Sequence, residues 1–312
     1  MTDPAALERL VQRIAAGGRL VAHARLNGGV STIAHRVDLE RADGTRLSLS
    51  VRRSSPDPAA HSHITPEKIA YEWDALKAVR AAGVAAPEPL LLDIEGEVLG
   101  TPGIVLSFVP GSPRFPAEDI EDFADEMAEV LAGLHSVTPD RYDLSALREK
   151  GRDALRERIG GYLRKVSATD PLARRVHDTL ERAVETIELL PPALIHGDAW
   201  CGNTIWHEGR PTFVDWGGCG VGDPRADVCE LRVDLALSRS LAAADAVLAA
   251  YERRTGPLPD LWFWDLYRGL EPLVEYEHWL EGYADFGHTD VTPEAARDRM
   301  QAFVTRALDA AG

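Results

Sequence analysis

The sequence predicts an α+β protein in two parts, an antiparallel sheet carrying one helix followed by a mainly helical part. Residues 19–53 alternate apolar and polar side chains around Asn-Gly and Asp-Gly turns, which is typical of hairpins. After Gly111 the apolar residues recur at helical spacing. We therefore divide the chain of 312 residues into an N-terminal domain, residues 1–110, and a C-terminal domain, residues 111–312.

The N-terminal segment MTDPAALERLVQRIAAGG predicts an amphipathic helix that ends at Gly17 and Gly18. It has neither the basic start nor the apolar centre of a signal peptide, and no later stretch is long and apolar enough to span a bilayer. We expect a cytoplasmic protein. The cysteines Cys201, Cys219 and Cys229 lack zinc-site spacing and fit small buried residues in a reducing compartment.

The first half of the chain contains five strand-like runs and one further helix. RLVAHARL, IAHRVDLE and TRLSLSVRR are joined by the turns NGGVS and DG. PEKIAYEWDALKAVRAAG predicts a helix, with Ile69, Trp73, Leu76 and Val79 on one face and Gly83 as its stop. VAAPEPLLLDIEGEVLGTPGIVLSFVPG adds two strand-like runs around an acidic glycine turn.

The second half is predominantly helical. FPAEDIEDFADEMAEVLAGLHSV predicts a helix whose acidic start suits the helix dipole. Further helices are predicted from about Leu144 to Val166, from Pro171 to Leu190, and from Arg225 to the end of the sequence. A stretch rich in proline and glycine, residues 191–224, interrupts them and carries most of the unusual chemistry.

The charge balance excludes some partners. The formal net charge is −16, and such a field repels phosphate backbones and anionic membrane surfaces. We therefore expect neither nucleic acid nor a membrane as partner. The same field attracts a polycationic substrate, although acidity also serves solubility alone.

The strongest motif is LIHGDAWCGNTIW followed by RPTFVDWGG. An apolar run leads to His196 and Asp198, Asn203 follows five positions later, and a second apolar strand ends at Asp215. This order predicts two aspartates and an asparagine around one volume. Phosphoryl transfer needs that set, because a carboxylate orients the attacking hydroxyl and hard oxygen ligands hold magnesium against the nucleotide. Gly197 allows a tight turn beside Asp198.

HGDxxxxN with a hydrophobic strand and DW resembles the catalytic and metal-binding signature of the aminoglycoside phosphotransferase family, relatives of the protein kinases. The resemblance implies a two-lobed protein-kinase-like fold, Asp198 as catalytic base, and Asn203 and Asp215 as Mg²⁺ ligands. VGDPRADVCEL is also similar to that family and implies that Asp227 anchors the catalytic loop, a role compatible with an ordinary helix N-cap. We interpret His196 as a hydrogen-bonded loop residue that supports the structure.

The N-terminal half agrees with this resemblance. NGGVST resembles the family's phosphate loop, which implies nucleotide contacts at Gly28, Gly29 and Ser31, although the stretch is equally typical of a hairpin turn. LSVR aligns with the strand that carries a phosphate-binding lysine, so Arg52 takes the lysine's place. Arg53 is the alternative, and it is otherwise a solvated surface charge.

Two further nucleotide contacts follow from the same resemblance. Glu72 matches the acidic residue that pairs with the phosphate-binding cation, although a surface pair with Lys68 or Lys77 also fits its spacing. LSFVPG resembles the segment that connects the two lobes and binds adenine through its backbone. Its candidate residues are Ser107, Phe108 and Val109.

The last third of the chain implies the acceptor pocket. In this family the C-terminal helices bind the acceptor, and LWFWDLYRGLEPLVEYEHWLEGYADFG is rich in acidic and aromatic residues. The candidates for a cationic acceptor are Asp265, Glu271, Glu275 and Glu281, with Trp279 or Tyr283 as an apolar wall. Glu271, Glu275 and Trp279 recur at i,i+4 and share one face of a helix. The alternative is an exposed acidic face opposite aromatic core residues.

These observations predict transfer of the γ-phosphoryl group of ATP or GTP to a hydroxyl of a small molecule, with an aminoglycoside as first choice. A choline, homoserine or sugar kinase and a macrolide kinase are alternatives. Arg52 in place of lysine and the Gly217-Gly218 pair leave a nucleotide-binding pseudokinase open. A metal-dependent hydrolase is the least favoured alternative, and its residues would be His196, Asp198, His207 and Asp215.

Overall fold

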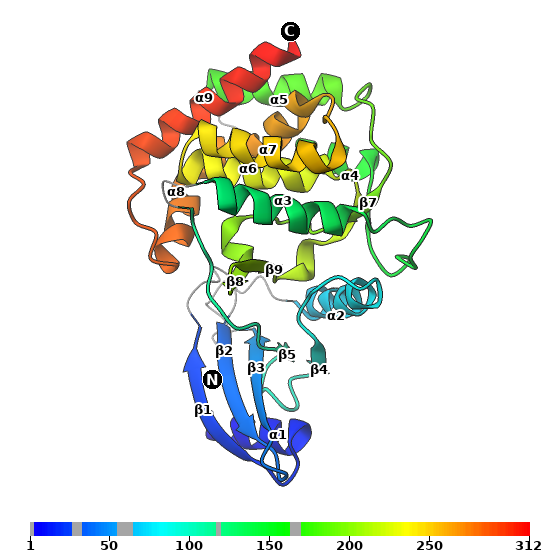
Figure 1. The fold of residues 1–312 in the computed structure, drawn as a ribbon, viewed down its shortest axis with the longest axis vertical. Helices are drawn as coiled ribbons and strands as arrows, with labels where there is room; N and C mark the ends of the chain where they lie inside the picture. Colours follow the sequence, from blue (N-terminus) through cyan, green and yellow to red (C-terminus); the bar gives the residue numbers. More distant parts are fainter. Residues whose placement is uncertain (1–2, 27–32, 55–64, 117–119, 163–169) are drawn as a thin grey trace. The chain divides into compact units, whose positions relative to one another are not determined.

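The computed structural model describes residues 3–26, 33–54, 65–116, 120–162 and 170–312. The chain forms two compact units (Figure 1), which we describe separately. The first unit comprises Met1–Gly111 and Val214–Gly217, and the second comprises Ser112–Phe213 and Gly218–Gly312. The segment Val214–Gly217 therefore returns to the first unit, a feature that a single division point in the sequence does not represent.

The first unit is built on a five-stranded antiparallel sheet with the strand order β1-β2-β3-β5-β4. Its strands are β1 (Arg19–Arg25), β2 (Ile33–Glu40), β3 (Arg46–Arg53), β4 (Pro89–Asp93) and β5 (Gly103–Ser107). The predicted strands are thus confirmed. The predicted phosphate loop, with Gly28, Gly29 and Ser31, lies outside the described residues.

Two helices belong to this unit, and both were predicted as helices, although the fold-class prediction counted only the one carried by the sheet. Helix α1 (Pro4–Ile14) buries Leu7, Leu10 and Val11 in one apolar cluster with sheet residues that include Leu49 and Val51. Its amphipathic pattern is what attaches it to the sheet, since the exposed apolar face of an isolated helix would otherwise remain in water.

Helix α2 (Pro66–Ala81) begins and ends at the signals in the sequence. The Thr65 side chain accepts a hydrogen bond from the Lys68 N–H at 3.3 Å, and Gly83, with φ of 83°, follows the last turn. Its buried face contains Ile69, Leu76 and Val79 as predicted, together with Glu72. A buried carboxylate on this face requires a partner, which the site described below provides.

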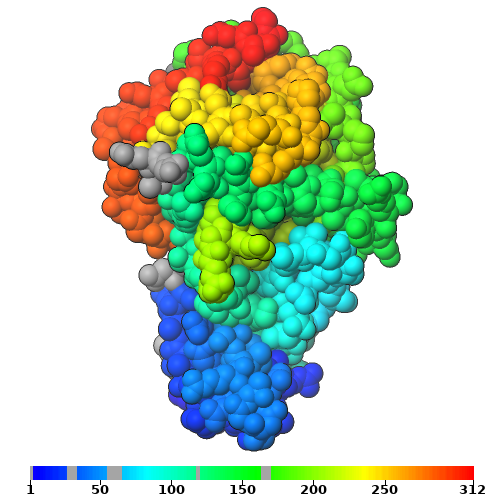
Figure 2. Space-filling view, viewed as in Figure 1, coloured from blue at the N-terminus to red at the C-terminus, as the bar shows by residue number. Residues whose placement is uncertain are grey.

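The second unit is mainly helical, as predicted. Its helices are α3 (Glu121–His135), α4 (Arg152–Tyr162), α5 (Pro171–Ala183), α6 (Arg225–Ser238), α7 (Leu241–Thr255), α8 (Leu261–Asp285) and α9 (Pro293–Ala311). Helix α6 is buried along its entire length and packs against α7, α8 and α9. Figure 2 shows α7 and α3 side by side on one face of this unit.

Short strands hold the loops of the second unit. They are β6 (Glu149–Lys150), β7 (Ala193–Ile195), β8 (Thr204–His207), β9 (Arg210–Phe213) and β10 (Gly220–Gly222). Strand β10 pairs with β6 in parallel and with β7 in antiparallel orientation, while β8 and β9 form a hairpin. The second unit also contains the 3₁₀ turn η1 (Cys201–Asn203). A second turn, η2 (Trp216–Gly218), begins in the part of the chain that belongs to the first unit.

Two predicted helices differ from the observed ones. The segment predicted as helical from Leu144 forms turns and strand β6 before α4 begins at Arg152, because β6 is held by its pairing with β10. Helix α5 ends at Ala183 rather than at Leu190. In the part of the chain that the structure describes, we find no helix with both the length and the apolarity needed to cross a membrane.

Helix α8 is interrupted in the middle. Pro272 lies inside it, and Glu275 has non-helical dihedral angles of φ −128° and ψ 28°. A proline removes one helical hydrogen bond and collides with the carbonyl four residues earlier, which kinks the helix. The prediction that Glu271, Glu275 and Trp279 share one helix face was therefore wrong, since the kink separates Glu271 from Trp279.

Candidate functional site

The loop after β7 depends on a glycine. Gly197 has φ of 80°, and a side chain there would overlap the carbonyl oxygen of Gly218. Only glycine accepts both the positive φ and this close approach. The loop carries Asp198 directly after this turn, so the position of Asp198 depends on it.

Replacement of Gly197 by alanine is expected to destabilise the second unit by about 2 kcal/mol or more, because the backbone must shift away from Gly218. Gly209→Ala is a matched control, since Gly209 also has φ of 80° but nothing lies within 4 Å of its missing side chain. Urea denaturation of both variants measures the effect. Equal destabilisation would show that backbone strain alone, and not the overlap with Gly218, explains the glycine.

Asp198 and Asn203 are in contact. The Asn203 side-chain Nδ2 donates to Asp198 Oδ2 at 2.7 Å and to the Asp198 carbonyl oxygen at 3.0 Å. Turn η1 positions Asn203 by bringing it back over the loop. Because its amide nitrogen is used by Asp198, the amide oxygen is the atom that Asn203 offers to a cation.

Asp227 holds the same loop from helix α6. Its Oδ2 accepts from the His196 N–H at 2.6 Å and its Oδ1 from the Gly197 N–H at 2.8 Å. His135 Nε2 lies 3.3 Å from Oδ2, and the other ring nitrogen of His135 contacts Tyr251 Oη at 2.8 Å. The N-cap of α6 is Pro224, so the alternative of an ordinary N-cap for Asp227 was wrong.

Burial alone would raise the pKa of Asp227, but the hydrogen bonds and the charge of His135 outweigh it and the pKa is lowered. His196 lies in the same region, is buried, and stacks on Phe213 with ring centroids 4.8 Å apart. These contacts suit a histidine that supports the loop.

In the first unit, Arg52 binds two carboxylates. Its Nη1 donates to Glu72 Oε1 at 2.6 Å and its Nη2 to Asp215 Oδ1 at 3.0 Å. Burial alone would lower the pKa of Arg52, but the charges of Asp215 and Glu72 outweigh burial and raise the pKa above its ordinary value. The guanidinium therefore stays charged. The alternative prediction, a surface ion pair of Glu72 with Lys68 or Lys77, was wrong, since Glu72 is buried against Arg52.

Arg53 does not join this group. In strand β3 it alternates with Arg52, is buried, and donates to Thr101 Oγ1 at 3.3 Å. The burial of Arg53 contradicts the alternative of a solvated surface charge, whereas a phosphate contact by Arg53 stays a prediction. Successive strand residues point to opposite faces, and only Arg52 points toward Glu72.

Asp215 has φ of 64°, a conformation that non-glycine residues rarely adopt and that is often found at functional sites. It belongs to the first unit, whereas Asp198 and Asn203 belong to the second. The meeting of all three side chains around one volume therefore stays a prediction.

Two of the three backbone N–H groups in the predicted adenine-binding segment donate hydrogen bonds within the first unit. The Ser107 N–H donates to the Glu88 carbonyl at 2.8 Å, and the Phe108 N–H donates to the Ser48 carbonyl at 3.0 Å. Because these two donors are used within the first unit, the N–H of Val109 is the one that we retain for adenine.

Three of the predicted acceptor residues are either used in buried hydrogen bonds or exposed to solvent. Asp265 is buried and accepts two hydrogen bonds from Arg232, at 3.0 and 2.9 Å. Tyr283 is buried and donates to Asp234 Oδ1 at 2.6 Å. Glu281 is 78% exposed and lies beside His278. Asp265 and Tyr283 therefore stabilise the interior rather than face an acceptor.

Both Trp279 and the buried Tyr283 contact the catalytic loop, the Tyr283 ring with its centroid 6.1 Å from that of Trp200. The Trp279 ring contacts Trp200, which lies between Asp198 and Asn203 in the sequence, with centroids 6.2 Å apart. Glu271 accepts from Arg158 Nη2 and from the Tyr162 hydroxyl, both at 3.2 Å. Glu275 is half-buried at the kink of α8.

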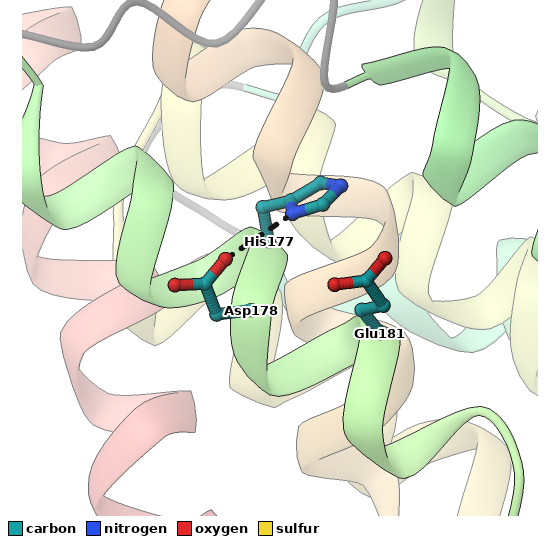
Figure 3. A group of neighbouring side chains, drawn as sticks. All are labelled: His177, Asp178 and Glu181. Carbon is teal, nitrogen blue, oxygen red and sulfur yellow. Dashed lines mark hydrogen bonds and ion pairs between the residues drawn. The ribbon is translucent and has the colours of Figure 1, made fainter.

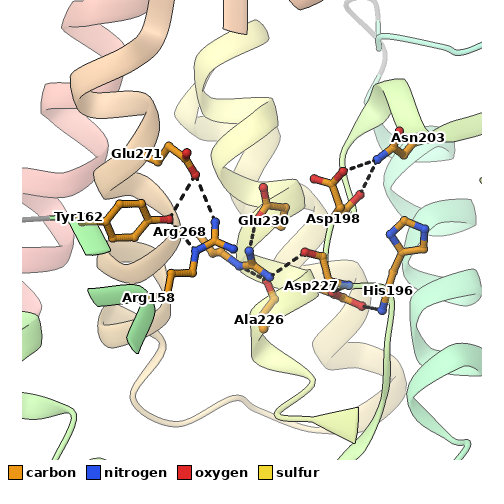
Figure 4. A network of polar contacts seen from close by, with 11 residues as sticks. Arg158, Tyr162, His196, Asp198, Asn203, Ala226, Asp227, Glu230, Arg268 and Glu271 are labelled. Carbon is orange, nitrogen blue, oxygen red and sulfur yellow. Dashed lines mark hydrogen bonds and ion pairs between the residues drawn. The ribbon is translucent and has the colours of Figure 1, made fainter. Parts of the chain in front are cut away.

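Figure 4 shows polar contacts among residues of the catalytic loop and of helices α4, α6 and α8, including those of Arg268, which the sequence analysis missed. Arg268 forms an ion pair with Glu230 at 2.7 Å and donates to the Ala226 carbonyl at 3.1 Å. Burial raises the pKa of Glu230 to about 7, Arg268 opposes this, and the charge of Asp198 adds to it. The signal in the sequence is the set of charged residues inside α6, an otherwise apolar helix.

A separate group of possible metal ligands lies on helix α5 (Figure 3). His177, Asp178 and Glu181 have ligand atoms within 4.8 Å of one another, and His177 Nδ1 lies 3.5 Å from Asp178. Glu181 is exposed and Asp178 is 47% exposed. Exposed acidic residues on one helix often meet in this way, and we assign the group no role.

The chain resembles known proteins in sequence. The model of a family described as "Phosphotransferase enzyme family" matches residues 25–273. A mouse protein, acyl-CoA dehydrogenase family member 10, is 27% identical over 186 residues. That match covers 55% of this chain but 16% of the mouse protein, so most of that protein has no counterpart here.

Solved structures resemble the whole chain. A Ralstonia eutropha protein provisionally assigned as an aminoglycoside phosphotransferase has a TM-score of 0.67 at 18% identity, with 98% of both chains covered. A thermostable mutant of aminoglycoside phosphotransferase APH(4)-Ia, in complex with ADP and hygromycin B, has a TM-score of 0.63 at 19% identity, with 96% of this chain and 97% of the other covered.

The macrolide 2'-phosphotransferase MphH from Brachybacterium faecium has a TM-score of 0.59 at 21% identity, with 95% of this chain and 96% of the other covered. At these identities the likeness shows the fold alone. It confirms the predicted α+β fold class with its kinase-like architecture.

Proposed function

The chain belongs to the phosphotransferase enzyme family, and we propose that it transfers the γ-phosphoryl group of ATP or GTP to a hydroxyl of a small molecule. The acceptor oxygen forms the new bond to the γ-phosphorus, the bond to the β,γ-bridging oxygen breaks, and the nucleoside diphosphate leaves. The hydroxyl proton passes to Asp198. The contact between Asp198 and Asn203 in a glycine-dependent loop is the observation that supports this proposal most directly.

The first unit is assigned to the nucleotide. Arg52 carries a permanent charge, and Glu72 fixes it from helix α2, which suits a cation that steadies phosphate oxygens. We assign adenine to the N–H of Val109 and the phosphates to the segment with Gly28, Gly29 and Ser31.

Asn203 and Asp215 would hold Mg²⁺, which supplies positive charge against the nucleotide phosphates. The donor set fits this ion, because both side chains offer hard oxygen atoms. Asn203 Nδ2 is used by Asp198 and Asp215 Oδ1 by Arg52, which leaves the Asn203 amide oxygen and Asp215 Oδ2 for the ion.

The test is acceptor-dependent ADP release with Mg-ATP or Mg-GTP and a panel of hydroxylated compounds. The panel contains an aminoglycoside, a macrolide, choline, homoserine and sugars, together with the anions gluconate and glucose 6-phosphate. The pseudokinase alternative predicts nucleotide binding without transfer to any of them. A protein that binds neither Mg-ATP nor Mg-GTP in a thermal-shift titration would contradict the proposal.

Replacement of Glu72 by glutamine is expected to weaken Mg-ADP binding about tenfold, because Arg52 loses a charged partner that orients it. Glu67→Gln, an exposed residue in the first turn of the same helix, is the control. Isothermal titration with Mg-ADP measures the effect. Unchanged affinity with reduced stability would mean that the Arg52–Glu72 pair serves the fold alone.

A further inference from the structure

The second unit contains a cavity of about 880 Å³ beside the catalytic loop. Helices α4 and α8, strand β6 and the loop after β7 line it, and its lining includes Gly197, the residue before Asp198. Tyr162, Trp264 and Tyr267 form aromatic parts of its wall. A cavity of this size, at this place, fits a small organic molecule.

Lys150 lines this cavity from strand β6. Its stem lies over two glycines of β10, because a side chain at Gly220 would come within 2.8 Å of Lys150 Cγ and one at Gly222 within 2.8 Å of Lys150 Cβ. The fold therefore leaves space for this one long side chain.

The charge of Lys150 has no partner in the described part of the chain. It makes neither a hydrogen bond nor an ion pair with any described residue. The charges that act on it most strongly are those of Arg268, Arg158 and Arg148, all positive. Burial lowers the pKa of the Lys150 ammonium, and these three arginines lower it further. Lys150 is half-buried. Cations that are withdrawn from water in proteins are normally paired, so a ligand can supply the counter-charge that Lys150 lacks among the described residues.

The acidic residues of the cavity do not supply that counter-charge. Glu271 accepts from Arg158, and Asp223 accepts two hydrogen bonds from Arg225, at 2.9 and 2.7 Å. Glu149 and Glu157 are exposed, and Glu149 is next to Lys150 in a strand, where successive side chains point to opposite faces. Lys150 is therefore a cation of the cavity lining that has no acidic partner among the described residues, although the chain as a whole is acidic.

The aromatic wall is also poorly suited to a cationic ligand. Recognition of a quaternary ammonium group uses the faces of aromatic rings. The Tyr267 ring already contacts the guanidinium groups of Arg158 and Arg268, at 5.6 and 5.5 Å from its centroid. Arg225 lies 5.4 Å from the centroid of Trp264. These rings already bind cations of the protein itself.

We propose that this cavity binds the acceptor, and that Lys150 pairs with an anionic group of that acceptor, a carboxylate or a phosphate. The inference rests on the proposed function, since it takes Asp198 to be next to the reacting hydroxyl. It replaces the aminoglycoside or choline of the sequence prediction with a hydroxylated organic acid or phosphate ester.

Four related sugars test the charge preference. Gluconate carries a carboxylate, glucose 6-phosphate a phosphate, glucosamine an ammonium group, and glucose no charge. Each is titrated calorimetrically into the full-length protein, with and without saturating Mg-ADP. We expect at least one of the two anions to bind more tightly than glucose and glucosamine, and the stronger anion identifies the group. Absence of binding by both anions, or tightest binding by glucosamine, would overturn the proposal.

Lys150→Gln is expected to weaken binding of the preferred anion about tenfold or more. Lys77→Gln removes a lysine that is 59% exposed on α2 and should bind the anion as the unmodified protein does. Equal affinity of the Lys150→Gln variant and the unmodified protein for the anion would overturn the assignment. Anion binding without acceptor-dependent ADP release would contradict the proposed function but leave this site intact, and ADP release with cationic acceptors alone would do the reverse.

Protein stability gives a second measurement. If Lys150 serves to bind a ligand, Lys150→Met should raise the Tm of the ligand-free protein by about 2 °C or more, because a half-buried charge without a partner is removed. The Lys77→Met control should leave the Tm unchanged. A lower Tm for Lys150→Met would mean that the ammonium stabilises the fold, which contradicts the proposal.

Discussion

Asp198→Asn is expected to lower kcat for phosphoryl transfer by about 10²–10⁴-fold, the range attributed to a positioned general base. Asparagine has nearly the same volume, and its amide oxygen can still accept from Asn203 Nδ2, which donates to Asp198 at 2.7 Å. The fold and Mg-ADP affinity should therefore be retained. What is lost is the carboxylate that takes the hydroxyl proton.

The measurement is acceptor-dependent ADP release, with Mg-ADP binding followed by calorimetry on the same preparations. Asp178→Asn is the matched control, because Asp178 is a half-exposed carboxylate on α5. We expect the control to keep full activity. Turnover by Asp198→Asn at the rate of the control would remove Asp198 from the role of base.

Asp227→Ala is expected to destabilise the protein by about 3–5 kcal/mol, the range for removing one partner of a buried charged network. The substitution leaves the N–H groups of His196 and Gly197 without their acceptor, in the interior of the second unit. The loop that carries Asp198 should loosen as well, so kcat should fall together with stability.

This effect has a defined pH dependence. The pKa of Asp227 is lowered from its ordinary value of 3.8 in the folded protein. A carboxyl with a depressed folded pKa contributes stability that is fully present above the unfolded pKa and is lost as the pH falls through the folded pKa. The difference between Asp227→Ala and the unmodified protein should therefore be constant near neutral pH and shrink below about pH 3.8.

Urea denaturation between pH 3 and pH 7 measures both effects. Asp309→Ala, at an exposed position of α9, is the control and should change stability little at any pH. If Asp227→Ala resembled this control, Asp227 would be an ordinary residue of the first turn of α6 and the anchoring of the loop would have another source.

Much of the fold was predictable because its signals are local. The strands around Arg52 follow from alternation and from turns with glycine, and helix α2 begins at Thr65 and ends before Gly83 as its caps require. The same holds for the motif around Asp198, whose residue types and spacing are readable without a structure. The failures lie where local signals compete with pairing, as in β6, whose two residues are held by β10.

The sequence by itself determined the fold class, the family, and the chemical types available at Asp198 and Asn203. Only the tertiary structure decided which charges are paired. Asp265 was a candidate acceptor residue until Arg232, 33 positions away, was found to bind it. Lys150 was one basic residue among 34 until the folded chain placed it, half-buried, in a cavity lining without an acidic partner among the described residues. Sequence spacing carries no information about such contacts, because the energy of a charge depends on its burial and on neighbours that the folded chain brings from distant positions.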